Sequence, residues 1–90
     1  MKRDRTSEPE LTLRTLLRQK RIEKGYTQLA LSLLLDNTRS FVSKYESGER
    51  YLTFTEVILI CKILGVDPIE ITKCVYLTFE DSFNSEIDLE

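Results

Sequence analysis

The sequence predicts an all-α fold in which five helices form one compact domain and a short C-terminal extension follows. Leucines and isoleucines recur at three- and four-residue spacing in several segments, as they do in helices with one buried side. Patterns that start helices stand before these segments, and each of the three glycines follows the expected end of a helix. We therefore expect an N-terminal arm at residues 1–9, a helical domain at 10–76 and an acidic extension at 77–90.

The first two helices are placed by their caps. Ser7 to Glu10 has the form of a capping box with a proline in the first turn, so a helix should start there and run to about residue 24, before Gly25. Thr27 is a suitable N-cap for a second helix at residues 28–35. Its buried side should be marked by leucines at helical spacing, namely Leu31, Leu34 and Leu35.

A very short turn separates the second helix from the third. Asp36 and Asn37 both tolerate turn geometry, and Thr38 can cap a third helix at residues 39–47, which Gly48 ends. Two short helices joined in this way form a helix-turn-helix unit.

Two more helices are expected in the second half of the chain. The fourth runs from Thr53 or Phe54 to Leu64 and ends at Gly65, and the fifth starts at residues 67–70 and continues through Ile71 towards Val75. Residues 75–79 are β-branched and aromatic, which fits either a continued helix or a short extended segment.

Composition bounds the class of protein. The chain has 41% hydrophobic and 31% charged residues, and its 90 residues suffice for one domain with a modest core. It has no run of about 18 apolar residues, and its first ten residues are polar, so we expect a cytoplasmic protein without membrane contact. Cys61 and Cys74 lack the spacing of a zinc site or a redox pair, and there is no histidine, so we expect reduced thiols and neither metal nor other cofactor.

Charge is divided between the two halves of the chain. Residues 1–50 carry eleven lysines and arginines against seven acids, whereas residues 51–90 carry two against eight. The local field at one face decides whether a phosphate backbone is attracted, so a net charge of −2 is compatible with DNA binding. The negative net charge of the whole chain does predict weaker non-specific binding to DNA.

Both ends of the chain leave alternatives open. Lys2, Arg3 and Arg5 fit a minor-groove arm or, more simply, a frayed terminus. Residues 80–90 hold five acids and no base, which is typical of a solvated tail unless Phe83 or Ile87 docks it on the domain.

Residues 27–50, TQLALSLLLDNTRSFVSKYESGER, resemble the Cro and lambda-repressor class of helix-turn-helix proteins, the XRE family, and the likeness covers about residues 13–71. It is carried by Arg21, Gly25, Thr27, Gln28, Leu31, Leu35, Ser43 to Glu46, Gly48 and Ile63 to Asp67. Ser32 stands where the class has alanine, Asp36 where it has the turn glycine, and Asn37 where it has an aliphatic residue. We expect the turn to differ locally, because left-handed backbone is less favourable for Asp or Asn than for glycine. The resemblance implies a lambda-repressor-like DNA-binding domain.

The outer side of the third helix suits the major groove. Val42 and Tyr45 lie three residues apart and should face inward. The side chains then left outside are Arg39, Ser40, Ser43 and Lys44. Arginine or lysine can donate to guanine O6 and N7, and serine can contact a base or a phosphate. The resemblance places Arg39, Ser40 and Lys44 at base-reading positions.

Phe41 has two interpretations. It either packs against its neighbours or stays exposed and touches a thymine methyl group or a sugar, and we expect it to be exposed and to join the base-reading set.

Phosphate contacts are expected around the two helices. Thr27 and Gln28 open the second helix, where free N–H groups favour an anion and where similar family members hold a DNA phosphate. Capping alone also explains Thr27, whereas Gln28 is assigned to a phosphate or to the support of Arg39. Further candidates flank the third helix, namely Thr38, Ser47, Arg50 and Tyr51, of which Arg50 is the foremost. The resemblance also implies a structural ion pair between Arg21 and Glu46.

The fourth helix has more apolar residues than one buried side needs. Its inward stripe is expected to be Val57, Ile60, Cys61 and Leu64. The remaining apolar residues, together with the end of the fifth helix, predict a twofold dimer on a palindromic operator. The expected interface residues are Ile58, Leu59, Ile63, Val75, Leu77 and Phe79.

These features predict a sequence-specific regulator of transcription that binds double-stranded DNA. The alternative is a helix-turn-helix module that binds another protein, such as an antitoxin with its toxin, but Arg39 and Lys44 on the outer side of the third helix argue against it. An enzyme is the weakest alternative, because the chain has no histidine and no glycine-rich phosphate loop.

Overall fold

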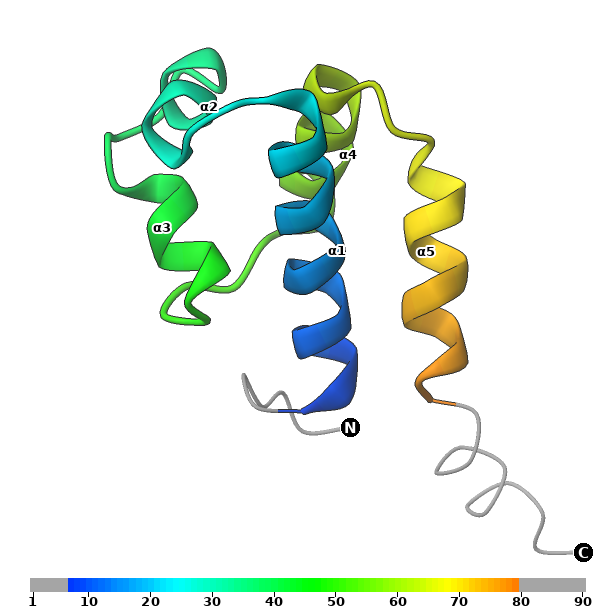
Figure 1. Cartoon of the computed structure of the whole chain (residues 1–90). Coiled ribbons are helices and arrows are strands. Elements are labelled where there is room, and N and C mark those ends of the chain that lie inside the picture. The colour runs from blue at the N-terminus through cyan, green and yellow to red at the C-terminus, as the bar shows by residue number, and fades with distance from the viewer. Residues whose placement is uncertain (1–6, 80–90) are drawn as a thin grey trace, which may run out of the picture.

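The computed structural model of the chain describes residues 7–79. Five α-helices make up its fold: α1 (Glu8–Lys24), α2 (Gln28–Leu34), α3 (Phe41–Glu46), α4 (Phe54–Leu64) and α5 (Pro68–Leu77). The predicted all-α fold is therefore confirmed. In Figure 1, α2 and α3 lie on one side of α1 and α5 lies on the other, and α4 packs against both α1 and α5. The expectations for the N-terminal arm before Ser7 and for the tail with Phe83 and Ile87 fall outside the described residues.

Most helix ends follow the predicted caps. The Thr27 side chain accepts a hydrogen bond from the N–H of Ala30, and Asp67 accepts one from Ile69. Gly25 and Gly65 end α1 and α4 in left-handed conformation. At the start of α1 the prediction is only half right, because Ser7 is the N-cap residue but its side chain makes no capping hydrogen bond within the described part of the chain.

The start of α3 differs from the prediction. The helix begins at Phe41 instead of Arg39, and its N-cap is Ser40 instead of Thr38. The Thr38 N–H is taken by the Asn37 side chain at 2.8 Å, and the Thr38 carbonyl accepts from the Phe41 N–H at 3.0 Å. These bonds hold residues 38–40 in a turn, so Arg39 and Ser40 precede the helix.

The turn between α2 and α3 adopts the conformation that usually calls for glycine. Asp36 has a φ of 55°, in the left-handed region, at the position where the resembling class has its turn glycine. The chain then closes onto α2, because the Asn37 N–H donates to the carbonyl of Ser32 at 3.0 Å. Asp36 therefore adopts a left-handed backbone conformation at an energetic cost compared with glycine.

One hydrophobic core joins all five helices. It consists of Leu17, Leu31, Leu35, Phe41, Val42, Tyr45, Leu52, Ile60, Cys61, Leu64 and Ile71. The predicted inward stripe of α4 is confirmed, with Ile60, Cys61 and Leu64 buried and Val57 packed beside them. Cys61 and the half-buried Cys74 are both free thiols, and burial raises the pKa of the Cys61 thiol.

The prediction for Leu34 is wrong, because its side chain is 52% exposed while Leu31 and Leu35 are buried. Leu29, Leu33 and Leu34 lie on a side of α2 that the other described helices leave open. Helical periodicity could not separate these leucines, since α2 is apolar around most of its circumference.

The open question at residues 75–79 is decided in favour of the helix. The helix α5 continues to Leu77, and a turn at Thr78 and Phe79 ends it. Val75 packs against the core from this last part of the helix, which explains why the β-branched segment stays helical. Within residues 7–79, no helix combines the length and the apolar character that crossing a bilayer requires.

Candidate nucleic-acid interface

The short helix α3 is fixed to the domain by three side chains. Val42 and Tyr45 face inward as predicted and are 0% and 1% exposed. Phe41 is also buried, at 4% exposed, so the expectation of an exposed phenylalanine is wrong. Its ring packs edge-on against Tyr45, with 5.4 Å between ring centroids. This contact removes Phe41 from the surface that could reach a thymine methyl group.

The polar residues predicted to read bases lie on the exposed side of α3 and in the turn before it. Arg39 and Ser40 are exposed in the turn, and Lys44 is exposed on the helix. Ser43 is half-buried, and its hydroxyl donates to the carbonyl of Ser40 at 3.0 Å. Arg39, Ser40 and Ser43 therefore lie at or just before the N-terminal half of α3, which is the part of a recognition helix that meets base edges, and Lys44 lies in the last turn of the helix.

A buried serine on α2 completes the start of α3. The Ser32 hydroxyl is fully buried, donates to the carbonyl of Gln28 at 2.9 Å and accepts from the N–H of Val42 at 3.1 Å. Ser40, the N-cap residue itself, makes no side-chain cap bond within the described residues. Ser32 thus supplies the capping acceptor from another helix. The sequence marked Ser32 as unusual but did not reveal this role.

We expect Ser32→Ala to destabilise the domain by about 1–3 kcal/mol, because it leaves the buried Val42 N–H without an acceptor. Ser40→Ala is the matched control, since it removes a hydroxyl that caps nothing in the described structure and should change stability by less than about 0.5 kcal/mol. Urea unfolding followed by circular dichroism measures both free energies. Equal losses for the two variants would contradict the cap from α2.

A buried ion pair joins α1 to the end of α3. The Arg21 Nε lies 2.7 Å from Oε2 of Glu46, and its Nη2 donates to Oε1 at 3.1 Å. The two side chains are 9% and 3% exposed. Arg21 also donates through Nη1 to the carbonyl of Tyr26 at 2.7 Å, so the link reaches the connection between α1 and α2.

Gln28 belongs to this same network. Its side-chain amide donates to Oε1 of Glu46 at 2.9 Å. One of the two sequence-based interpretations had Gln28 supporting Arg39, but the amide donates to Glu46 instead. The carboxylate of Glu46, the last residue of α3, therefore accepts hydrogen bonds from α1 and from the first turn of α2. This arrangement sets the position of α3 relative to the helix that precedes it.

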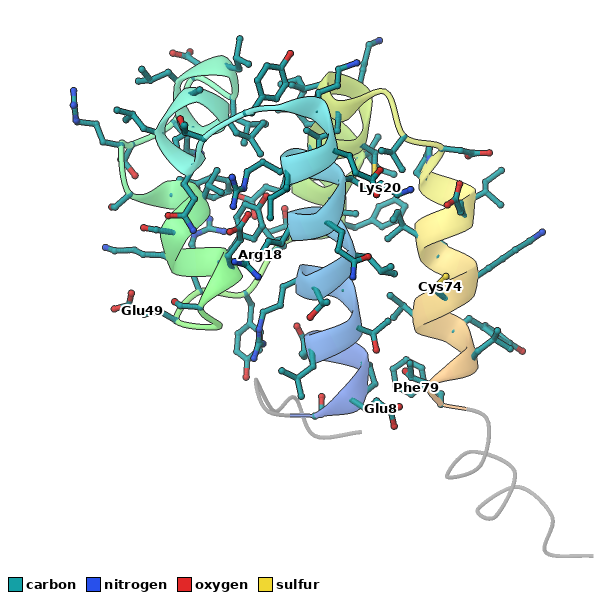
Figure 2. The ribbon with its side chains drawn as sticks, in the orientation of Figure 1. Glu8, Arg18, Lys20, Glu49, Cys74 and Phe79 are labelled. Carbon is teal, nitrogen blue, oxygen red and sulfur yellow. The ribbon has the colours of Figure 1, made fainter. Side chains whose placement is uncertain are left out.

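Arg18 is a cation near α3 that the sequence did not single out. Its Nε lies 3.9 Å from Oε1 of Glu46, and its side chain is 62% exposed. Figure 2 shows Arg18 directed from α1 towards α3. The Glu46 carboxylate already accepts from Arg21 and Gln28 at shorter range, so the Arg18 charge adds to the basic surface beside α3.

The phosphate candidates with hydroxyl side chains differ in their exposure and in the hydrogen bonds that they already make. Thr27 and Thr38 are exposed, and the hydroxyl oxygen of Thr27 accepts the hydrogen bond that caps α2. The exposed Ser47 donates to the carbonyl of Lys44 at 3.0 Å and accepts from the N–H of Glu49 at 3.3 Å, while Tyr51 is half-buried. Thr27 lies at the start of the helix-turn-helix unit, Thr38 in its turn, and Ser47 and Tyr51 after its end.

Arg50, the foremost phosphate candidate, is engaged within the chain. Its Nη1 and Nη2 donate to the two carboxylate oxygens of Glu56, each at 2.8 Å, and Nη1 also donates to the carbonyl of Tyr51 at 2.8 Å. The guanidinium lies over the ring of Phe41, 4.8 Å from its centroid. The hydrogen bonds from Arg50 hold the pKa of the Glu56 carboxyl below its ordinary value of 4.5, at about 2, so Glu56 is charged at neutral pH.

Glu56 also completes the N-terminal cap of α4. Its carboxylate accepts from the Thr53 N–H at 2.8 Å, and Thr53 accepts from the Glu56 N–H at 3.2 Å, which makes a full capping box. The spacing Thr53-x-x-Glu56 could have revealed the box from the sequence. The pairing with Arg50 could not be seen there.

The residues expected at a dimer interface fall into two groups. Ile58, Leu59 and Leu77 are exposed, whereas Ile63 and Val75 pack against the core and Phe79 is half-buried. Figure 2 shows Phe79 turned towards the start of α1. The apolar residues of α4 and α5 that are most exposed include three not predicted for the interface, namely Phe54, Ile69 and Tyr76.

Comparison with known families agrees with this geometry. A sequence model of a family described as helix-turn-helix matches residues 17–71, which span the ion pair, α2, the turn, α3 and α4. Separate comparisons with curated proteins and with solved structures gave no match. The matched segment covers more than half of the 90 residues. The chain therefore belongs to the XRE family of DNA-binding helix-turn-helix proteins, which has the Cro and lambda-repressor architecture.

Proposed function

We propose that this protein regulates transcription by binding a specific double-stranded operator, with α3 in the major groove. The observation that carries the proposal is the set of polar side chains on α3 and in the turn before it, of which Arg39, Ser40 and Lys44 are exposed. Arg39 and Lys44 supply donors for guanine, and Ser40 and Ser43 supply hydroxyl groups. All four are presented by backbone that Ser32 and Glu46 fix to the rest of the domain.

The same surface favours DNA over a protein partner as the main ligand. Its exposed side chains are cationic and polar, and Phe41, the one large apolar residue expected there, is buried. Arg18 adds a further positive charge from α1. A module that used α3 to bind another protein would be expected to expose aromatic side chains at this place.

Selection of bound sequences from a pool of random duplexes tests the proposal. We expect a short consensus to emerge and to be palindromic, because a twofold dimer places two copies of α3 one helical turn apart on DNA. Recovery of unrelated sequences after several rounds, at an affinity equal to that of the starting pool, would contradict a specific operator.

We also propose that the protein dimerises through the outer faces of α4 and α5. The interface is best described by apolar side chains that are at least 36% exposed, namely Phe54, Ile58, Leu59, Ile69, Tyr76 and Leu77. Ile63 and Val75 support this surface from below, because they pack against the core. A second copy would cover an apolar area that solvent otherwise contacts.

Leu77→Asp should convert the dimer into a monomer. A carboxylate at this position would be buried against the apolar surface of the other copy, so the molar mass from light scattering at tens of micromolar should fall by about half. Leu33→Asp on α2 is the matched control, because Leu33 is 55% exposed and Leu77 is 60% exposed. A monomeric wild-type protein, with and without DNA, or an equal effect of both variants would contradict the proposed interface.

A further inference from the structure

Arg50 has one side of its guanidinium occupied and the other side free. At the end of the guanidinium, the Glu56 carboxylate accepts one hydrogen bond from Nη1 and one from Nη2. The Tyr51 carbonyl accepts a hydrogen bond from the second N–H of Nη1. An arginine has five N–H donors. The two that remain, on Nε and Nη2, point along one edge of the group and have no partner among residues 7–79.

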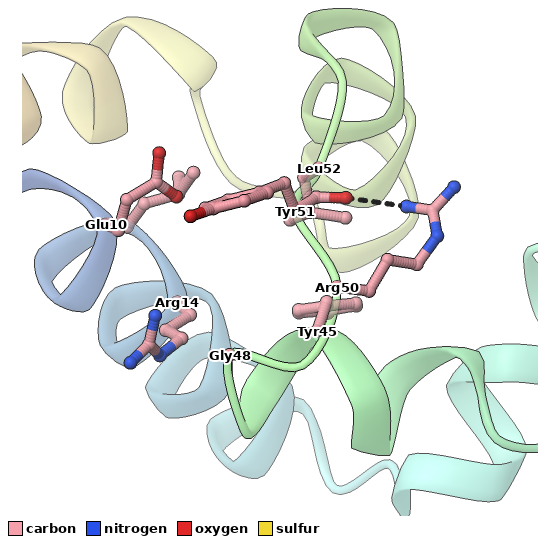
Figure 3. A pocket seen from close by; sticks show the side chains of 8 residues that line it. Glu10, Arg14, Tyr45, Gly48, Arg50, Tyr51 and Leu52 are labelled. Carbon is pink, nitrogen blue, oxygen red and sulfur yellow. Dashed lines mark hydrogen bonds between the residues drawn. The ribbon is translucent and has the colours of Figure 1, made fainter. Parts of the chain in front are cut away.

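The free edge belongs to a side chain that is partly exposed and lies beside α3. Arg50 is 41% exposed in its side chain, and its stacking on Phe41 anchors it to the first residue of α3. In Figure 3 the guanidinium is directed away from the small hollow that Glu10, Arg14 and Tyr45 line. Two parallel N–H groups on a fixed guanidinium match two oxygens of one phosphate.

We propose that Glu56 raises the ratio of operator affinity to random-DNA affinity by neutralising Arg50 and orienting its free edge towards one backbone phosphate. The inference rests on the proposed function. The paired carboxylate cancels the Arg50 charge, so this arginine adds little to the sequence-independent attraction of DNA. In the fully docked complex the free edge donates two hydrogen bonds whose direction Glu56 and Tyr51 have already fixed.

Charge and hydrogen bonding at this site can be separated with three variants. Glu56→Gln leaves the Arg50 charge uncompensated, Arg50→Ala leaves the Glu56 charge uncompensated, and the double variant has no charge on either residue, like the neutral wild-type pair. Glutamine is also suitable as the third residue of a capping box, so α4 should still form in Glu56→Gln. Thermal melting by circular dichroism checks that each variant is folded.

For random duplex DNA we expect the salt dependence to follow the net charge of the pair. Glu56→Gln should steepen the slope of log K against log salt by about one and tighten binding roughly five- to tenfold near 0.1 M salt. Arg50→Ala should flatten the slope by about one, and the double variant should match the wild type. Thr53→Ala, which removes the cap of α4 without changing any charge, is the control and should leave binding to random DNA unchanged.

For the selected operator the double variant should bind at least about fivefold more weakly than the wild type, since it lacks the two hydrogen bonds to phosphate. Glu56→Gln should lower the ratio of operator affinity to random affinity. An unchanged salt slope in Glu56→Gln, or a double variant with wild-type operator affinity, would overturn the inference. Absence of any operator preference in the wild-type protein would instead contradict the proposed function.

Discussion

Replacing Glu46 with alanine is expected to lower the stability of the domain by about 3–5 kcal/mol, because the Arg21 guanidinium then stays buried without its carboxylate. Gln28 loses its acceptor in the same variant. For a domain of this size the melting temperature should fall by more than about 12 °C. A thermal melt followed by circular dichroism at neutral pH measures the change.

Glu49→Ala is the matched control for this variant. Glu49 is an acid three residues further along the chain, and its side chain is exposed (Figure 2). Its replacement should alter stability by less than about 0.5 kcal/mol. If the two variants melt at the same temperature, the carboxylate of Glu46 does not hold α1, α2 and α3 together.

Lys44→Ala is expected to weaken binding to the selected operator by about 1–3 kcal/mol and to relax the preference at one base pair of each half-site. Lys44 is exposed in the last turn of α3, where its ammonium group can reach a base edge. Binding to random duplex should weaken much less, because a base contact discriminates between sequences. Fluorescence anisotropy with operator and random duplexes measures both affinities.

Lys62→Ala controls for the loss of one positive charge. Lys62 is exposed in the last turn of α4, away from α3, so its replacement should reduce the two affinities by the same small factor. A repeated selection with Lys44→Ala shows whether one position of the consensus has lost its preference. The assignment of Lys44 to a base fails if operator and random DNA weaken equally.

The sequence predicted the helices well because their signals are local. Thr27, Asp67 and the glycines after α1 and α4 act within one turn of the residues that they cap, so their effect can be inferred from neighbouring letters. The inward positions of Val42 and Tyr45 also follow from helical spacing alone.

The parts that the sequence could not predict depend on contacts between distant residues. The Ser32 hydroxyl reaches the N–H of Val42, ten positions away, and Glu56 lies six positions from Arg50 in a different element. Phe41 was expected to be exposed and to touch DNA, but Tyr45 and the Arg50 guanidinium cover its ring. Such pairings depend on how the helices pack, which helical periodicity does not specify.

The shortness of α3 has a consequence for hydrogen exchange and for the heat of binding. A helix of six residues does not persist by itself in water, so α3 depends on the rest of the domain, in which Phe41, Val42 and Tyr45 are buried, Ser32 caps its start and Arg21 pairs with its last residue. Its amide protons should therefore exchange only when the whole domain opens, as slowly as those of the core in α4. Because no segment of α3 has to fold on contact with DNA, the change in heat capacity on binding should reflect only the area that the interface buries.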